Sequence, residues 1–153
     1  MRRRSTYLAH SQSLIRFANG ASMYAWIAVA VGGALGSVAR HGVNRLVHQG
    51  WPLLRFPLAT VVVNIVGCCL IGVLAGLVAT GRLPMRTNWR EVVFVGILGG
   101  FTTFSTFGLD TITMVRSGDS SQAVLNIVLH VVCGLAAVHF GLVAVERFGV
   151  ITR

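Results

Sequence analysis

The amino-acid sequence predicts an all-α membrane protein with four transmembrane helices. Of its 153 residues, 54% are hydrophobic and only 11% are charged, whereas about 25% of the residues of an average soluble domain are charged. Four apolar runs are each long enough to cross the hydrocarbon core, which takes about 20 residues of helix. Short segments rich in glycine, proline and polar residues separate these runs. The remaining length leaves no room for a separate soluble domain.

We expect a single four-helix transmembrane domain over residues 23–153. Its spans are predicted from the apolar runs at residues 23–47, 56–80, 91–115 and 122–145. Residues 1–22 are polar and contain several arginines, so we expect a disordered tail, and Met23 is an alternative start of translation. Glycines recur four residues apart on the first two spans, as in Gly32 and Gly36, which predicts a close approach of helix backbones.

The basic residues are all arginines, and they give the chain a net charge of +9. Their position at the ends of apolar runs favours contact with anionic membrane lipid over binding of nucleic acid. One predicted side of the membrane holds Arg16, Arg82, Arg86, Arg90, Arg147 and Arg153, and the other holds Arg40, Arg45, Arg55 and Arg116. This bias is too weak to fix an orientation, so insertion in both orientations is physically reasonable.

The sequence does not indicate an enzyme. Neither a Ser-His-Asp set nor a phosphate-binding loop occurs at a usable spacing. Cys68, Cys69 and Cys133 lie inside apolar runs, at a spacing that does not fit a metal site. We therefore interpret these cysteines as small packing residues.

The third span contains the most unusual segment, GGFTTFSTF at residues 99–107. Adjacent glycines and clustered threonines weaken a helix, so we predict that this span is broken between Gly99 and Phe104. Backbone outside a helix cannot face lipid and must be buried in protein or line a polar cavity. The backbone carbonyls near Gly99 and Thr102 are therefore candidates to bind a cation or water.

Two aromatic residues of this segment, Phe104 and Phe107, share one face of the helix that follows the predicted break. The edge of an aromatic ring is positive, so the pair could receive an anion. Packing in the protein core is the alternative, and periodicity alone favours it. Ser105 and Thr106 lie between the rings and can donate hydrogen bonds to an anion or to their own backbone.

Other polar residues of the spans require a reason, because polar groups in a membrane are costly. Asn64 can point into a pore or join two helices, and Arg40 can draw anions into a vestibule or snorkel to the interface. Asp110 lies inside the third span, while Asn126 and His130 lie four residues apart on the fourth. These last three residues are candidates for one polar track in the protein interior.

From Met23 to its end, the chain resembles the Fluc (CrcB) family of fluoride ion channels. The motifs that carry this resemblance are GGALGSVAR ending at Arg40, FPLATVVVNIVG around Asn64, and GGFTTFSTF in the third span. The resemblance implies a fluoride-selective channel of the bacterial plasma (inner) membrane that exports cytoplasmic fluoride passively and reduces its toxicity. It also implies an antiparallel, dual-topology dimer of identical or homologous chains, with pores at the interface and a structural sodium ion at the centre.

The resemblance also assigns individual residues. It places the fluoride pathway at Phe104, Phe107, Asn64, Ser105, Thr106 and Arg40. The structural sodium ion would be held by the backbone carbonyls of Gly99 and Thr102. The chain departs from the family pattern at Ala59 in place of glycine, Asp110 in place of glutamate, Asn126 in place of tyrosine and His130 in place of serine.

Two other functional classes stay open on the residues alone. A small dual-topology multidrug or cation antiporter has a similar size and charge balance, but it requires a membrane carboxylate early in the chain, and the first two spans have none. A membrane assembly partner that transports nothing is the second alternative. Flux through the purified protein separates these classes from a fluoride channel.

Overall fold

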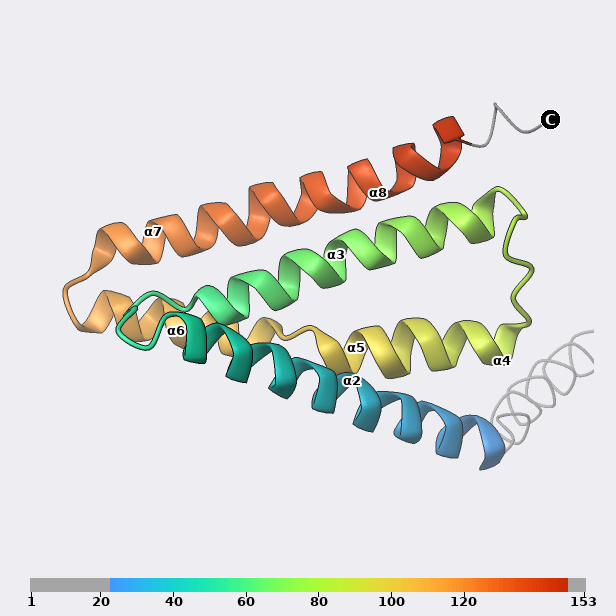
Figure 1. The fold of residues 1–153 in the computed structure, drawn as a ribbon, viewed down its shortest axis with the longest axis horizontal. Coiled ribbons are helices and arrows are strands. Elements are labelled where there is room, and N and C mark those ends of the chain that lie inside the picture. The colour runs from blue at the N-terminus through green and yellow to red at the C-terminus, as the bar shows by residue number, and fades with distance from the viewer. Residues whose placement is uncertain (1–22, 149–153) are drawn as a thin grey trace, which may run out of the picture.

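Four long helical segments, each antiparallel to the one before it in the chain, form the computed structural model, which describes residues 23–148 (Figure 1). The first two segments are α2 (Met23–Gly50) and α3 (Leu58–Ala79). The third is made of α4 (Thr87–Arg90), the π-helical η1 (Glu91–Leu98), α5 (Gly99–Phe101) and α6 (Phe104–Arg116). The fourth is made of α7 (Ser120–Val128), the π-helical η2 (Leu129–Cys133) and α8 (Gly134–Phe148). The predicted tail at residues 1–22 lies outside the described residues.

Three of the four segments are long and apolar enough to cross a membrane, namely Leu58–Ala79, Glu91–Arg116 and Ser120–Arg147. The remaining segment, α2, has 28 residues, or about 42 Å of helix at 1.5 Å per residue. No strand occurs between residues 23 and 148. These findings confirm the all-α class and three of the predicted spans, and α2 supplies a helix at the position of the remaining one.

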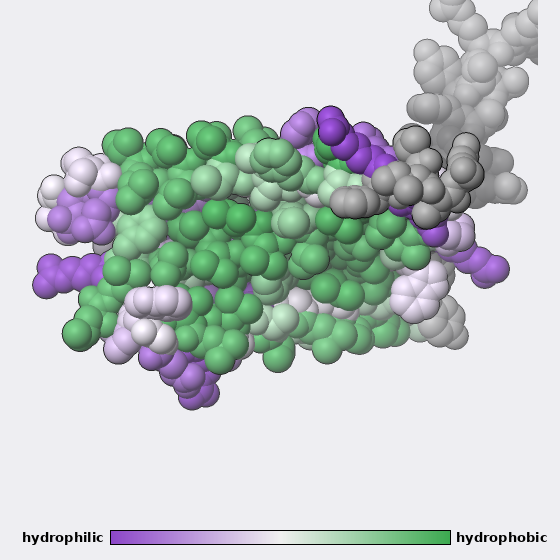
Figure 2. All heavy atoms as spheres, turned by 45° about the horizontal axis from the view of Figure 1, so that its top comes forward, coloured by the Kyte–Doolittle hydropathy of each residue, from purple (hydrophilic) through white to green (hydrophobic). Residues whose placement is uncertain are grey.

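Apolar side chains cover the outside of the molecule. Trp26, Leu35, Leu109, Leu135 and Phe140 are each more than half exposed, and Figure 2 shows apolar atoms over the middle of one face with hydrophilic side chains toward both ends. Helices that are apolar all round are typical of chains whose solvent is lipid or protein rather than water. The surface therefore fits a multi-pass membrane protein.

Glycines hold the helices in two close pairs, in which α3 packs on α8 and α2 packs on η1 and α5. A Cβ atom on Gly36 of α2 would overlap the carbonyl oxygen of Ile97, and one on Gly72 of α3 would overlap the carbonyl oxygen of Val138. From the opposite side, a Cβ atom on Gly141 would lie 2.7 Å from the carbonyl oxygen of Cys69. Small residues therefore allow backbone-to-backbone packing, as their spacing predicted.

The third segment is interrupted within the predicted range, but not at the paired glycines. Gly99 and Gly100 are helical, and the extended residues are Thr102, with ψ of 159°, and Thr103, with φ of −151° and ψ of 114°. Gly100 has a different role, because a Cβ atom there would overlap the carbonyl oxygen of Gly33 on α2. The glycines permit helix contact, whereas β-branched threonines tolerate the extended conformation at the break.

The close approach of α2 to the third segment predicts unequal effects of two glycine substitutions on one helix. Gly36→Ala should lower the thermal denaturation midpoint in detergent, because the new methyl group overlaps the backbone of Ile97. Gly42→Ala is the matched control, since nothing lies within 4 Å of the added atom and alanine favours a helix over glycine by about 1 kcal/mol. Equal midpoints for the two variants would contradict this packing.

Candidate functional site

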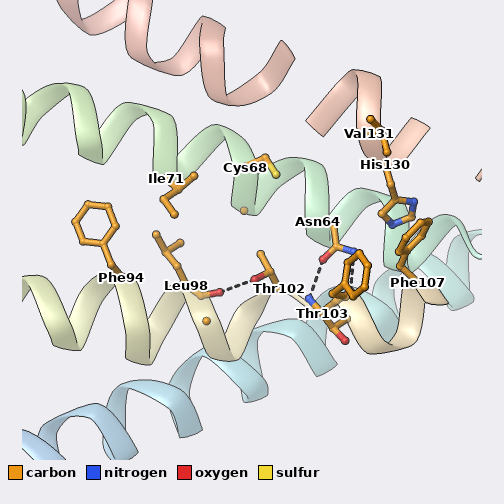
Figure 3. A pocket seen from close by; sticks show the side chains of 13 residues that line it. Asn64, Cys68, Ile71, Phe94, Leu98, Thr102, Thr103, Phe107, His130 and Val131 are labelled. Atoms are coloured by element: carbon orange, nitrogen blue, oxygen red, sulfur yellow. Dashed lines mark hydrogen bonds between the residues drawn. The ribbon is translucent and has the colours of Figure 1, made fainter. Parts of the chain in front are cut away.

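The broken peptide of the third segment is bound by one side chain of α3. Asn64 accepts a hydrogen bond at Oδ1 from the Thr103 N–H at 2.8 Å, and its Nδ2 donates to the Thr103 carbonyl at 2.9 Å (Figure 3). The backbone N–H can only donate, so this pairing fixes which end of the amide faces it. Asn64 therefore joins two helical segments, and its second Nδ2 hydrogen remains available beside the break.

The break frees two backbone carbonyls from their helical partners. In a continuous helix the N–H groups of Thr103 and Thr106 would donate to the carbonyls of Gly99 and Thr102. Here the Thr103 N–H donates to Asn64, and the Thr106 N–H donates to the Thr103 hydroxyl at 3.3 Å. Side-chain oxygens of Asn64 and Thr103 thus accept the hydrogen bonds that the two carbonyls would receive in a continuous helix. Arg40 of α2 donates from Nη1 to the Thr102 carbonyl at 3.5 Å.

Hydroxyl groups gather at the amino end of α6. Thr103 is the N-cap, and its Oγ1 lies 3.0 Å from Thr106 Oγ1 and 3.2 Å from Ser105 Oγ. The first N–H groups of a helix carry a partial positive charge. This end of α6 therefore offers both hydroxyl and backbone donors to an anion.

A cleft of about 410 Å³ lies between α3, the third segment and η2. Its lining residues are Asn64, Gly67, Cys68, Ile71, Phe94, Leu98, Gly99, Thr102, Thr103, Phe104, Phe107, His130 and Val131. Figure 3 shows most of these side chains facing one another across the gap between the segments. Both π-helical elements contribute to the lining, and such elements are frequent at functional sites. The cleft is mostly apolar, with a few polar groups at the break.

The aromatic pair lies along this cleft rather than in a protein core. Phe104 is 81% exposed in the single chain, and its ring centroid lies 5.3 Å from that of Phe107 at an interplanar angle of 57°. Phe107 in turn packs on His130, with ring centroids 4.4 Å apart. Burial within one chain, the alternative for this pair, is therefore excluded for Phe104.

The three candidate residues of the polar track have different partners. Asp110 accepts a hydrogen bond from the Thr60 hydroxyl at 2.9 Å and lines a second, more polar cleft of about 330 Å³ beside Thr106. Asn126 is fully buried and donates to the Thr111 hydroxyl at 2.9 Å. His130 lines the main cleft. Of the other two candidate residues, Asn126 contacts His130, through its backbone carbonyl. The structure thus separates Asp110 from Asn126 and His130.

Three threonines of the site were not predicted from the sequence as its partners. Thr103 caps α6, Thr60 holds Asp110, and Thr111 holds Asn126. The sequence could have indicated Thr60, because it lies four residues before Asn64 and therefore on the same face of α3. Thr111 carries no such signal, because it does not share a helix face with another candidate polar residue at a spacing that marks it.

Among residues 23–148, no three His, Cys, Asp or Glu side chains come together to hold a metal ion. Cys68 and Cys133 are half-buried free thiols and Cys69 is an exposed one. Any cation bound at this site would therefore depend on carbonyl or hydroxyl oxygens.

The family model described as CrcB-like protein, Camphor Resistance (CrcB), matches residues 27–142. A protein of Methylobacillus flagellatus named "Fluoride-specific ion channel FluC" is 44% identical over 119 residues, which cover 78% of this chain and 92% of the relative. Relatives of the same name from Erythrobacter litoralis and Saccharophagus degradans are 41% and 38% identical, and the matches cover 82% of this chain and 95% and 92% of those proteins.

The two bonds between Asn64 and the Thr103 peptide predict a loss of stability when the amide is removed. Asn64→Leu has a similar volume but cannot bond, so the free energy of unfolding should fall by about 1–3 kcal/mol, the value of two hydrogen bonds or of an unsatisfied buried peptide. Denaturation of the purified protein by SDS in mixed micelles measures it.

The matched control is Asn44→Leu on α2. The Oδ1 atom of Asn44 is buried without a hydrogen-bond partner, so its removal should cost little or should stabilise the fold. If Asn44→Leu destabilised the protein as much as Asn64→Leu, the pairing of Asn64 with the break would not be the cause.

Proposed function

The chain belongs to the CrcB family, and from that premise we propose that it is a fluoride-specific ion channel that lets cytoplasmic fluoride leave the cell passively. Its apolar helices and its relatives make it a multi-pass bacterial membrane protein and a transporter rather than an enzyme. The observation that carries the proposal is the cleft at the broken third segment. There the amino end of α6, a group of hydroxyls and two aromatic rings lie together.

The chemistry of this cleft fits a small dehydrated anion. The Ser105 and Thr106 hydroxyls and the free hydrogen of the Asn64 amide are donors, and the amino end of α6 adds a partial positive charge. The rings of Phe104 and Phe107 line the same cleft, and the edge of an aromatic ring is positive. Donors and ring edges would replace the water that fluoride loses on entry. No energy source is required, because hydrogen fluoride enters a cell as a neutral acid and the anion leaves down its own gradient.

We further propose that the working unit is a dimer of inverted copies, with an identical or a homologous chain as partner. Phe104 projects from the single chain at 81% exposure, and the cleft that it lines is not enclosed by the chain. A second chain would close the cleft and remove this ring from lipid. The nearly balanced arginines of the sequence support insertion in both orientations.

A structural sodium ion at the dimer centre is a further proposal, and the freed carbonyls support it. Gly99 and Thr102 lose their helical donors to the side chains of Asn64 and Thr103, and hard cations bind such oxygens. Two carbonyls of one chain are too few for a cation, and a second inverted copy would double the number. When bound, the ion would supply a positive charge that fixes the two breaks against each other. The Arg40 guanidinium also contacts the Thr102 carbonyl, at 3.5 Å. A sodium ion at this oxygen would therefore displace the guanidinium or share the oxygen with it.

Fluoride flux from liposomes tests the proposed function. The purified chain is reconstituted, fluoride is loaded, and valinomycin with potassium balances the charge while a fluoride electrode records efflux. We expect rapid efflux of fluoride, no comparable efflux of chloride and no dependence on a proton gradient. A protein that moves cations only against protons, or that gives no flux, would reject the proposal.

The position of the ring edges predicts the effect of replacing them. Phe104→Ile and Phe107→Ile should each slow fluoride efflux by about tenfold or more, equivalent to roughly 1.4 kcal/mol in the barrier, because isoleucine has no positive edge. Phe140→Ile is the matched control, since Phe140 is 68% exposed on α8 away from the cleft. Wild-type efflux from both cleft variants would show that the anion takes another route.

A further inference from the structure

His130 has one ring nitrogen that the fold satisfies and one that it does not. Its Nδ1 lies 2.9 Å from the carbonyl oxygen of Asn126, one turn earlier on the same segment. Its Nε2 is buried and has no hydrogen-bond partner. A buried polar atom without a partner costs about 1–3 kcal/mol, so a ligand that satisfies it would be favoured.

The bond to Asn126 determines what the free nitrogen can do. A carbonyl oxygen can only accept, so Nδ1 carries the hydrogen and donates it. In the neutral ring Nε2 then holds a lone pair, which accepts and repels an anion. When a proton from the surrounding solution binds Nε2, the same atom becomes a donor on a positively charged ring. The anion and the proton would therefore bind together.

The position of the ring makes this exchange relevant to transport. His130 lines the main cleft together with Asn64 and Phe104, and its ring packs on that of Phe107 at 4.4 Å. A small anion in the cleft would therefore come to lie beside the imidazole and the aromatic ring edges.

We propose that His130 is a proton-dependent anion site of the fluoride pathway, where fluoride binds as an ion pair with the protonated ring. The proposal rests on the proposed function. Binding linkage is reciprocal, so bound fluoride favours the protonated ring and acidic solution favours fluoride binding. Fluoride affinity at the cleft should therefore rise as the pH falls.

The groups that face His130 from the surrounding elements are few. Cys68 of α3 is the other titratable side chain among the described residues that line the cleft, and Cys133 lies on η2 itself. From α6, Asp110 is held by Thr60 on the side of the second cleft. From α2, the Arg40 guanidinium contacts the Thr102 carbonyl at the break. Histidine is the side chain whose charge ordinarily changes near neutral pH, so the substitutions that test the pH response are made at residue 130.

Current through single channels in a planar bilayer tests the proposal, because neutral hydrogen fluoride crosses lipid without carrying current. The fluoride concentration that gives half-maximal conductance is measured at pH 8.0, 7.0, 6.0 and 5.5. We expect this concentration to fall at least threefold in the wild type between the highest and the lowest pH. In His130→Gln and in His130→Ser it should not change with pH, because neither side chain binds a proton in this range.

His139→Gln is the matched control, since His139 lies exposed on α8 beside Phe140 and outside the cleft. It should keep the pH response of the wild type. A wild-type half-maximal concentration that is independent of pH overturns the proposal even if no variant at residue 130 folds, and so does a response that survives in His130→Gln. In both cases the fluoride current itself remains, whereas absence of any fluoride current from the wild type rejects the proposed function instead.

Discussion

The paired hydrogen bonds between the Asn64 amide and the Thr103 peptide are the interaction on which the site depends. At membrane depth an unpaired peptide group finds no water, so a helix cannot open unless other groups take over its donors and acceptors. An asparagine amide has one donor and one acceptor side by side, and it matches a peptide N–H and carbonyl at 2.8 and 2.9 Å. Without it, the N–H and the carbonyl of the extended Thr103 would both lose their Asn64 partners beside the cleft.

This arrangement also explains which parts of the fold the sequence could predict. Apolar length and spaced glycines depend on residues close together in the chain, so the helical segments and a close approach of helix backbones follow from them, but which helices pair does not. The location of the break cannot be predicted from local sequence, because it depends on partners from other helices. Gly99 and Gly100 weaken a helix in isolation, yet both are helical here, and contact with α2 requires glycine at residue 100. The interruption lies instead at Thr102 and Thr103, where the Asn64 side chain bonds the Thr103 N–H and carbonyl.

The same difference between local and distant information applies to the site. The spacing of Phe104 and Phe107 predicted that they share a helix face, but it favoured core packing, and the structure places both along one cleft. The candidate track of Asp110, Asn126 and His130 was inferred from depth and spacing, and the structure separates Asp110 because Thr60 of α3 holds its carboxylate. Asn126 is turned to Thr111 of the neighbouring segment. Depth in the membrane can be read from sequence, but the side toward which a polar residue points requires the packed neighbours.

One interruption can serve ions of both signs because it creates two helix ends of opposite polarity. The amino-terminal half of the third segment ends at the break, where the carbonyls of Gly99 and Thr102 have lost their helical N–H donors and carry a partial negative charge. The second half begins there with Thr103, Ser105 and Thr106, whose N–H and hydroxyl groups are positive. A cation proposed for the first end and an anion proposed for the second would thus bind within a few residues of each other, and each would reduce the electrostatic cost of the other. A continuous helix has neither end at this depth. The extended threonines therefore provide two charged helix ends in the middle of an apolar span.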